Sequence, residues 1–571
     1  MWAVFGVLIG LAALGLPVLV VVLLVRAGKR GATGAQVPGA PLRRFFQYGL
    51  MFLALVLSGW GLTGLIEAAV EGGDLLRGRS QVAGSLSLVV VAAPAFLLLA
   101  SWTRRRLADD EGERLSIGWL LYLTAAILSA LVTAMFSLAG FISSLLGDAA
   151  WSATLWINAA VWGAVWWAHW WAARRYPPPD AGRSHRLLGS LFGLWGTLAS
   201  VIAIGVILLD TAYYEMFGSG LLSSPVDDLL TVVGPLVVSG AVWWWYWHRH
   251  TRTEGDSTGW QAHVLLGGVL VGLLAVIVAG GVILFSVLGW FLLDSRDSAL
   301  DAFAPVPSAL AIAVVGWLSW VYHRRVLDTA PATRAGEVRR TYTYLLSAVG
   351  LSAMVLGLTF LIAATIEAAT GGAVLSIFDG GHLALWGLTL FIVGTPLWWR
   401  AWSSVQGEGL DGVDERTSPA RRLYLSASFG IGGLLALVAL INVATRFFED
   451  LFEGSFSSAT IYDVRWSVAL VLAVGAMAAY HWRVFRADRQ AQPAGTTSLE
   501  RLLLVAPGEA AALGRALAER TGVRVEVWRT GEGEASIDAV AAVLESIDGP
   551  EGVVVVGPDG AVTGMSARRL G

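Results

Sequence analysis

Residues 163–167 read Gly-Ala-Val-Trp-Trp, and the same five residues recur at positions 240–244. Each copy closes a long apolar run and is followed by a histidine and an arginine. Both copies belong to a larger repeat of six units, and each unit is predicted to be two helices joined by a loop. The second helix of every unit ends in aromatic residues next to a basic or polar one. These endings are Trp102-Thr103-Arg104, Trp166-Trp167-Ala168-His169, Trp245-Tyr246-Trp247-His248-Arg249, Trp320-Val321-Tyr322-His323-Arg324, Trp398-Trp399-Arg400 and Tyr480-His481-Trp482-Arg483.

The composition identifies a membrane protein. The mean hydropathy is +0.66 and only 14% of the residues are charged, whereas soluble domains carry about 25% charged residues. Apolar stretches of the roughly 20 residues that a helix needs to cross the hydrocarbon recur from residue 2 to residue 482. With one helix at residues 1–26, the six units predict an all-α polytopic membrane protein of about thirteen transmembrane helices. The absence of cysteine excludes disulfides, thiol catalysis and cysteine-ligated metals.

The six units group into three larger repeats. Pro94, Pro235 and Pro396 stand in the second helices of units one, three and five, and the other second helices have no proline there. Units one and five also share the sequence Ile-Glu-Ala-Ala, at 66–69 and 366–369. Three modules of four helices follow, at residues 43–184, 185–338 and 339–486. We refer to them as modules 1, 2 and 3.

Charge predicts the orientation. The apolar run Met1–Val25 precedes Arg26, Lys29 and Arg30, an order that indicates an uncleaved span with its N-terminus outside. The segments between units hold 24 Arg and Lys residues, and the loops within units hold 5. Positive residues stay in the cytoplasm, so the C-terminus is expected to be cytoplasmic. The predicted location is the inner membrane of a bacterium.

The last part of the chain differs in composition. Residues 487–498 are predicted to be a linker, and residues 499–571 a small cytosolic α/β domain with the order βαβαββ. A domain of about 70 residues is near the lower size limit for an independent fold. Docking or self-association is therefore expected to stabilise it.

The repeat resembles a bacterial membrane-protein family of unknown function, the domain of unknown function 5671. The resemblance is carried by the Arg-Arg-x-x-x-Tyr sequence of Arg43, Arg44 and Tyr48 and by the helix endings quoted above. It covers residues 43 to about 486. The resemblance implies a multi-spanning membrane protein and brings no activity and no catalytic residues.

The helix endings are predicted to be membrane-interface anchors, because Trp and Tyr rings favour the headgroup level. Four of them carry a histidine, and imidazoles on adjacent helices are an alternative set of ligands for a haem or metal. Anchoring is the preferred interpretation, since every histidine neighbours aromatic residues and arginine, and no cofactor or metal is expected. The predicted anchors are Trp102, Trp167, His169, Trp247, His248, Trp320, His323, Trp399, His481 and Trp482.

A few polar residues are candidates for an ion or solute path, because ionisable groups inside a membrane are costly. Glu67, Asp210 and Glu367 lie where the first helix of a unit leaves the membrane, and the alternative is a solvated helix end. Asn158 and Asn442 stand inside predicted helices. The acidic loops at 213–228 and 449–463 could collect a hard cation, but their spacing fits no known calcium loop.

Two classes of function remain. The preferred one is a non-enzymatic membrane scaffold or sensor that binds a cytosolic protein through residues 499–571. The alternative is a permease or channel for a small solute or ion, since transporters often contain repeats. The arginines flank the membrane, so the lipid bilayer is the expected partner and nucleic acid is not. The sequence does not determine an oligomeric state.

Overall fold

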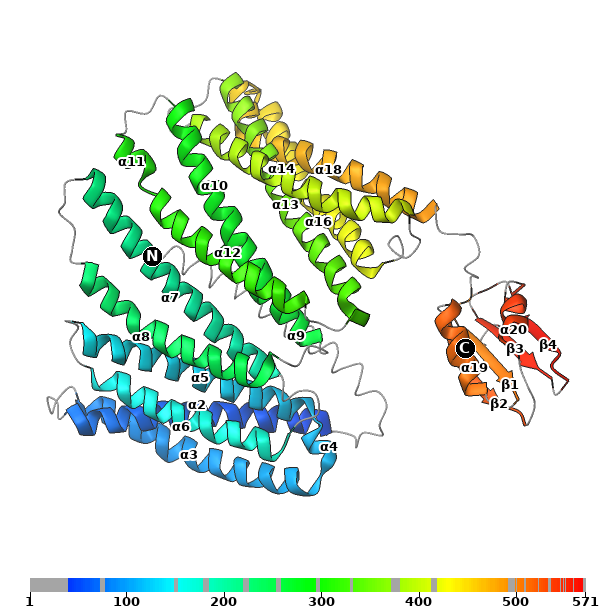
Figure 1. Ribbon diagram of the computed structural model, residues 1–571, viewed down its shortest axis with the longest axis horizontal. Helices are drawn as coiled ribbons and strands as arrows, with labels where there is room; N and C mark the ends of the chain where they lie inside the picture. Colours follow the sequence, from blue (N-terminus) through cyan, green and yellow to red (C-terminus); the bar gives the residue numbers. More distant parts are fainter. Residues whose placement is uncertain are drawn as a thin grey trace. The chain divides into compact units, whose positions relative to one another are not determined.

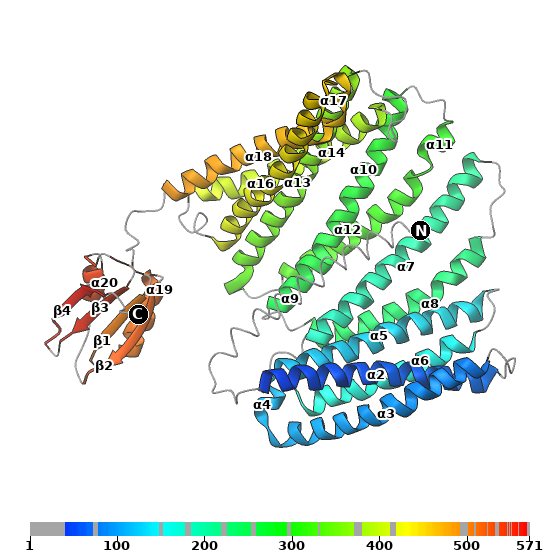
Figure 2. The same cartoon turned by 180° about the vertical axis from the view of Figure 1, so that it is seen from behind.

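The computed structural model describes residues 40–71, 78–147, 152–177, 184–218, 225–252, 258–293, 298–328, 332–370, 380–411 and 418–490, and most of 499–567. Long helices fill the part before residue 490, and a small sheet with two helices follows it (Figures 1 and 2). The predicted first span at residues 1–26 and most of the predicted linker lie outside the described residues. Two compact units comprise residues 1–407 with 434–475 and residues 408–433 with 476–571.

Each predicted module contains four long helical segments. Module 1 consists of α2 (Ala40–Glu71), α3 (Gly78–Asp109), the short α4 (Glu111–Arg114), α5 (Ile117–Leu146) and α6 (Ala153–Arg175). Module 2 begins with α7 (Ser184–Phe217), followed by α8 (Pro225–Trp243), which continues as the π-helix η2 (Trp244–Thr251). Its third segment is made of α9 (Thr258–Ala262), the π-helix η3 (His263–Leu270) and α10 (Val271–Leu292). Its fourth segment is made of α11 (Ala299–Phe303) and α12 (Val306–Asp328). Module 3 consists of α13 (Ala332–Thr370), α14 (Gly380–Asp411), α16 (Pro419–Glu453), α17 (Ser458–Asp463) and α18 (Arg465–Gln490).

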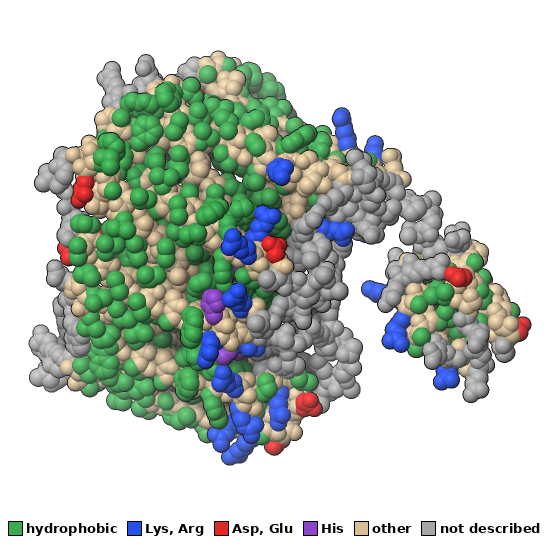
Figure 3. Space-filling view, in the orientation of Figure 1, with side chains coloured by type: hydrophobic (Ala, Val, Ile, Leu, Met, Phe, Trp, Pro, Cys, Tyr) green, Lys and Arg blue, Asp and Glu red, His purple; other side chains and the backbone are tan. Residues whose placement is uncertain are grey.

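Among the described residues, 11 helices are long and apolar enough to cross a membrane. The helix α6 is not one of them, because its tryptophans, Asn158 and His169 lower its hydropathy. A multi-pass membrane protein is therefore confirmed, while the count of thirteen and the grouping into three modules stay predictions. Large apolar side chains such as Leu98, Phe136 and Phe291 are exposed on these helices. Hydrophobic side chains cover much of the face of the helical part seen in Figure 3. Such a surface is expected in lipid.

The helices of a unit pack against each other, as α2 does with α3 and α5 with α6. The first and last helices of a module also meet, as α2 with α6 and α7 with α12. In α13 and α14, a Cβ added at Gly350, Gly357, Gly387 or Gly394 would meet the backbone of the facing helix. Small residues of this kind let helix backbones approach closely in lipid. The three repeat prolines lie inside α3, α8 and α14, as predicted.

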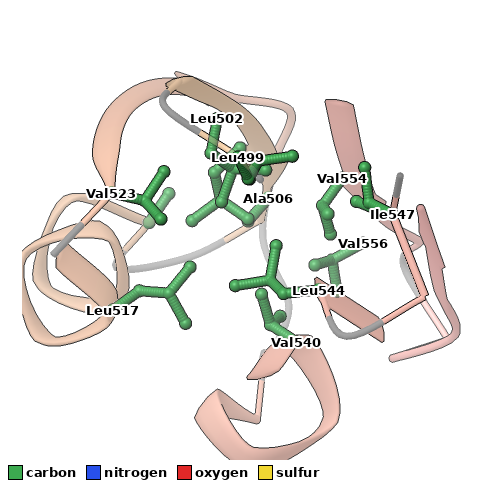
Figure 4. Close-up of a cluster of buried hydrophobic side chains, with 12 residues drawn as sticks. Leu499, Leu502, Ala506, Leu517, Val523, Val540, Leu544, Ile547, Val554 and Val556 are labelled. Carbon is green, nitrogen blue, oxygen red and sulfur yellow. The ribbon is translucent and has the colours of Figure 1, made fainter. Parts of the chain in front are cut away.

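The C-terminal domain has the predicted order of elements. Its sheet has the strand order β2-β1-β3-β4, in which β1 is parallel to β2 and β3, and β4 is antiparallel to β3. The elements are β1 (Arg501–Ala506), α19 (Ala510–Thr521), β2 (Arg524–Arg529), α20 (Ile537–Leu544), β3 (Glu551–Val556) and β4 (Val562–Ser566). Alternate strand residues face one core with Leu517, Val540 and Leu544 of the helices (Figure 4). The helix α18 continues to Gln490, so the predicted linker begins as helix.

Candidate functional site

The three acidic candidates occupy equivalent places in the three modules. Thr154, near the start of α6, donates a hydrogen bond to Glu67 of α2. Ser308, near the start of α12, donates to both carboxylate oxygens of Asp210 of α7, at 3.2 and 3.3 Å. Glu367 of α13 is buried and pairs with Arg465, the first residue of α18, at 3.2 Å. Each carboxylate thus ties the first helix of a module to the N-terminus of its last helix, where the helix dipole favours negative charge.

The two asparagine candidates also bond within their own modules. The Asn158 side chain donates to the main-chain oxygen of Thr154 at 3.0 Å, and Asn442 accepts from Ser467 at 3.0 Å. The structure therefore brings Glu67, Thr154 and Asn158 together in module 1. Asp210 lies in module 2, and Glu367 and Asn442 lie in module 3 with different partners. Among the described contacts, none joins these residues into one path.

The acidic loop of module 3 surrounds an arginine. Arg446 lies 2.9 Å from Asp463, 3.5 Å from Asp450 and 3.7 Å from Glu449. Asp450 also accepts a hydrogen bond from Thr460. A guanidinium group occupies the position where a cation could have been bound. In the part of the chain that the structure describes, no three His, Asp or Glu side chains are placed to hold a metal ion.

At the opposite end of module 1, the Arg-Arg-x-x-x-Tyr sequence encloses a carboxylate. Glu113 of α4 is completely buried and accepts hydrogen bonds from Arg43 at 2.6 Å, Arg44 at 3.1 Å and the Tyr48 hydroxyl at 2.9 Å. Burial raises the pKa of the Glu113 carboxyl, but the bonds from Arg43, Tyr48 and Arg44 outweigh burial and hold that pKa below its ordinary value of 4.5. We call this end of the helices, which carries the between-unit arginines, the basic end.

Sequence reasoning missed Glu113, although a signal was present. The pattern Glu-Arg-x-Ser followed by Tyr six residues later occurs at 113–122 and again at 415–424. The second glutamate, Glu415, lies outside the described residues. The recurrence of a carboxylate at one point of two repeats would have indicated a partner for the arginines.

Three predicted histidine anchors do not face lipid headgroups. His169, His323 and His481 are buried, and the Nδ1 atom of each contacts the main-chain oxygen four residues earlier at 2.8 to 2.9 Å. The Nε2 atoms of His169 and His481 meet the hydroxyls of Tyr122 and Tyr424, at 2.8 and 3.3 Å. The anchor interpretation is corrected for these residues, because all three are buried inside the protein. A tyrosine of the paired helix meets Nε2 of His169 and His481, whereas Nε2 of His323 is buried with no hydrogen-bond partner among the described residues.

The remaining anchors divide by exposure. Trp102, Trp167, Trp399, Trp482 and His248 are exposed at their helix ends, and Trp320 is half-buried. Arginine side chains lie over the rings of Trp102, Trp320 and Trp482. Trp247 is fully buried, and its indole N–H donates to the Tyr322 hydroxyl at 2.8 Å, so this residue is also corrected from surface anchor to core.

Comparison with known proteins finds a match to one family model. No curated protein and no solved structure matches the chain. A family model, Domain of unknown function (DUF5671), matches residues 44–157 and residues 340–461. The matched segments contain Arg44, Tyr48 and Glu113 of module 1 and most of α13 with all of α14 and α16 of module 3. Of the resemblance expected over residues 43–486, the family model therefore matches two segments, one in module 1 and one in module 3, as a repeated domain of unknown function.

Proposed function

We propose that this protein is a non-enzymatic membrane scaffold or sensor, and that its C-terminal domain binds a cytosolic protein. The observation that carries the proposal is an uncovered face of the C-terminal sheet. Both α19 and α20 pack against one face, through Leu502, Leu504 and Val554. The opposite face has no helix of the domain on it, in the residues described.

This open face is apolar at its centre. Leu503 and Val505 of β1 lie beside Val553 and Val555 of β3, and Val505 is also paired with Trp528 of β2. Trp528 is 59% exposed, and Met565 of β4, paired with Val553, is 52% exposed. A contiguous apolar patch with an aromatic residue is typical of protein–protein interfaces.

Charged residues border the patch. Arg501 and Glu551, at the ends of β1 and β3, form an ion pair of 3.4 Å. Arg524 and Glu526 alternate with apolar residues on the edge strand β2. A hydrophobic centre with a charged rim suits a soluble protein partner better than the lipid interior.

The membrane part supports the scaffold over the permease. A permease is expected to keep polar groups free along a hydrated path. Here Glu67, Asp210 and Glu367 instead each bind the start of a helix in their own module. The excess of arginine between units supports a cytoplasmic position for the tail.

Photocrosslinking in living cells tests the proposal. A photoreactive amino acid is placed at Trp528 of the full-length protein, and a matched one at Arg515, which is exposed on α19. We expect a discrete adduct with one protein at position 528, lost when Met565→Glu is added, and no such adduct at 515. Equal adducts at both positions, or none at 528, would contradict a partner on this face. Solute uptake by proteoliposomes of the purified protein would favour the permease instead.

A further inference from the structure

Four aromatic side chains meet at the basic end, between modules 1 and 2. Trp170 of α6 has its ring centre 6.4 Å from Trp245 and 5.4 Å from His250, both in η2. Trp245 and His250 are 5.2 Å apart, and His185 of α7 lies edge-on to Trp170 at 5.4 Å. We call these four residues the Trp170 cage.

The π-helix creates this cage. Trp245 and His250 are five residues apart, and in an α-helix such residues point about 140° away from each other around the axis. In a π-helix, whose hydrogen bonds join residues five apart, they lie one turn above each other. Trp243, the last residue of α8, and His248 of η2 show the same contact, at 5.3 Å. π-Helical turns are rare in proteins, and those that occur are often found at functional sites. The cage is therefore not explained by helix packing alone.

Three nitrogens of the cage lack a partner. Nε1 of Trp170, Nε1 of Trp245 and Nε2 of His250 are buried, and none of them has a hydrogen-bond partner among the described residues. Trp170 is only 4% exposed. A buried donor without an acceptor is costly, and an indole N–H can only donate. Three such nitrogens on rings that contact one another therefore indicate a ligand that accepts hydrogen bonds.

The surroundings of the cage are positive. The segments 153–175, 184–209 and 229–252 contain five arginines and no Asp or Glu. Arg174 lies over the Trp170 ring at 5.6 Å, and the charges of Arg174, Arg186 and Arg249 act on His250. Figure 3 shows arginines and histidines gathered along this margin of the helices. The adjoining linkers add Asp180, Arg183, Glu254 and Asp256, which lie outside the described residues.

Elsewhere at the basic end, carboxylates pair with arginines. Glu113 binds Arg43 and Arg44 in module 1, and Asp488 binds Arg421 in module 3 through two bonds of 2.6 and 3.1 Å. The cage stands next to the N-terminus of α7, where helix geometry favours an anion. An acceptor with negative charge suits both the unpartnered nitrogens and the arginines.

We propose that the Trp170 cage binds the phosphate group of an anionic ligand at the membrane surface. The phosphate oxygens accept hydrogen bonds from Trp170, Trp245 and His250, and Arg174 balances the charge. A phospholipid headgroup and free phosphate share this chemistry. The depth of the cage, beside exposed Trp167 and Trp171 on the same helix, favours the headgroup, since basic pockets between spanning helices recognise anionic lipids. The inference is independent of the function proposed for the C-terminal domain.

Lipid titration of the full-length protein in detergent tests the cage. Phosphatidylglycerol and phosphatidylcholine are added in parallel, and bound lipid is counted by native mass spectrometry. We expect phosphatidylglycerol to bind more tightly, and the double variant Trp170→Phe, Trp245→Phe to weaken its binding at least tenfold, because bonds to a charged group are strong. Trp167→Phe, the same change at an exposed residue of α6, should leave binding unchanged.

Two further arms complete the test. Arg174→Gln removes an exposed charge without disturbing the core, and we expect it to weaken phosphatidylglycerol binding severalfold. The thermal unfolding midpoint is also measured at increasing concentrations of inorganic phosphate. If phosphate raises the midpoint of the wild type but not that of the double variant, and phosphatidylglycerol binds no better than phosphatidylcholine, the site is assigned to free phosphate. Equal lipid binding by the double variant and by Trp167→Phe, with no effect of inorganic phosphate on either, would overturn the proposal.

Discussion

The carboxylate of Glu113 accepts hydrogen bonds from two arginines and one tyrosine at the basic end of module 1. All three partners come from α2, and they include every residue of the Arg-Arg-x-x-x-Tyr sequence. The Arg-Arg-x-x-x-Tyr sequence thus has a physical role, which is to hold α4 against α2. Removing one partner of a buried ion pair leaves the others uncompensated.

The first prediction concerns Glu113→Gln. The two arginines are partly exposed, with 28% and 18% of their side-chain surface accessible, so we expect a loss at the low end for a buried pair, about 2–3 kcal/mol. The measurement is the thermal unfolding midpoint of the purified protein in detergent. Glu111→Gln, an exposed glutamate of the same short helix, is the control and should change stability little. An equal effect of both variants would refute the role given to Glu113.

The second prediction is the pH dependence of the same cluster. Its hydrogen bonds lower the pKa of Glu113 below 4.5, so the carboxylate contributes stability that is full above its unfolded pKa and is lost as pH falls through the folded one. The difference in unfolding midpoint between wild type and Glu113→Gln should therefore be constant from pH 7 to 5 and shrink below 4.5. A difference that grows on acidification would show that the sign is wrong.

At the scale of elements, the first and last helices of each module are joined at the end opposite the basic end. The joins differ in strength, because Thr154 and Ser308 are neutral donors whereas Arg465 is charged and forms a buried pair with Glu367. Asp210 is half-buried, and its carboxylate accepts its hydrogen bonds from the hydroxyl of Ser308. We therefore expect module 3 to depend most on its join.

A double-mutant cycle measures that dependence. Glu367→Gln and Arg465→Gln are made singly and together, and we expect a coupling free energy of about 1–3 kcal/mol, as for contacting charged residues. The cycle Asp210→Asn with Ser308→Ala should give about 1 kcal/mol or less, the range of an ordinary hydrogen bond. Equal couplings in both cycles would contradict the ranking.

Sequence periodicity predicted the elements better than the direction of their side chains. The helix endings and the prolines located the helical units, and the predicted order βαβαββ is the order of the elements in the C-terminal domain. The rotation of a helix about its axis is set by its neighbours, so the burial of His169, Trp247, His323 and His481 could not be read from an aromatic ending. The π-helical turns that build the Trp170 cage depend on tertiary packing and left no pattern in the sequence.

At the scale of the whole molecule, the described helices bury little of their apolar surface against one another, and the C-terminal domain has a separate core. One part of the chain is therefore expected in lipid and the other in water. We expect the C-terminal domain to lie on the side of the between-unit arginines, in the cytoplasm, and the segment 444–466, which contains Arg446 and Asp463, to lie on the other side.

Cysteine accessibility tests this arrangement most directly, because the chain has no cysteine of its own and each introduced thiol is unique. Ser458→Cys marks the α17 end of module 3 and Ala561→Cys marks the C-terminal domain; both positions are exposed. In sealed spheroplasts, a membrane-impermeant maleimide should label Ser458→Cys and label Ala561→Cys only after lysis. Labelling of Ala561→Cys in sealed cells, with Ser458→Cys protected, would contradict the account.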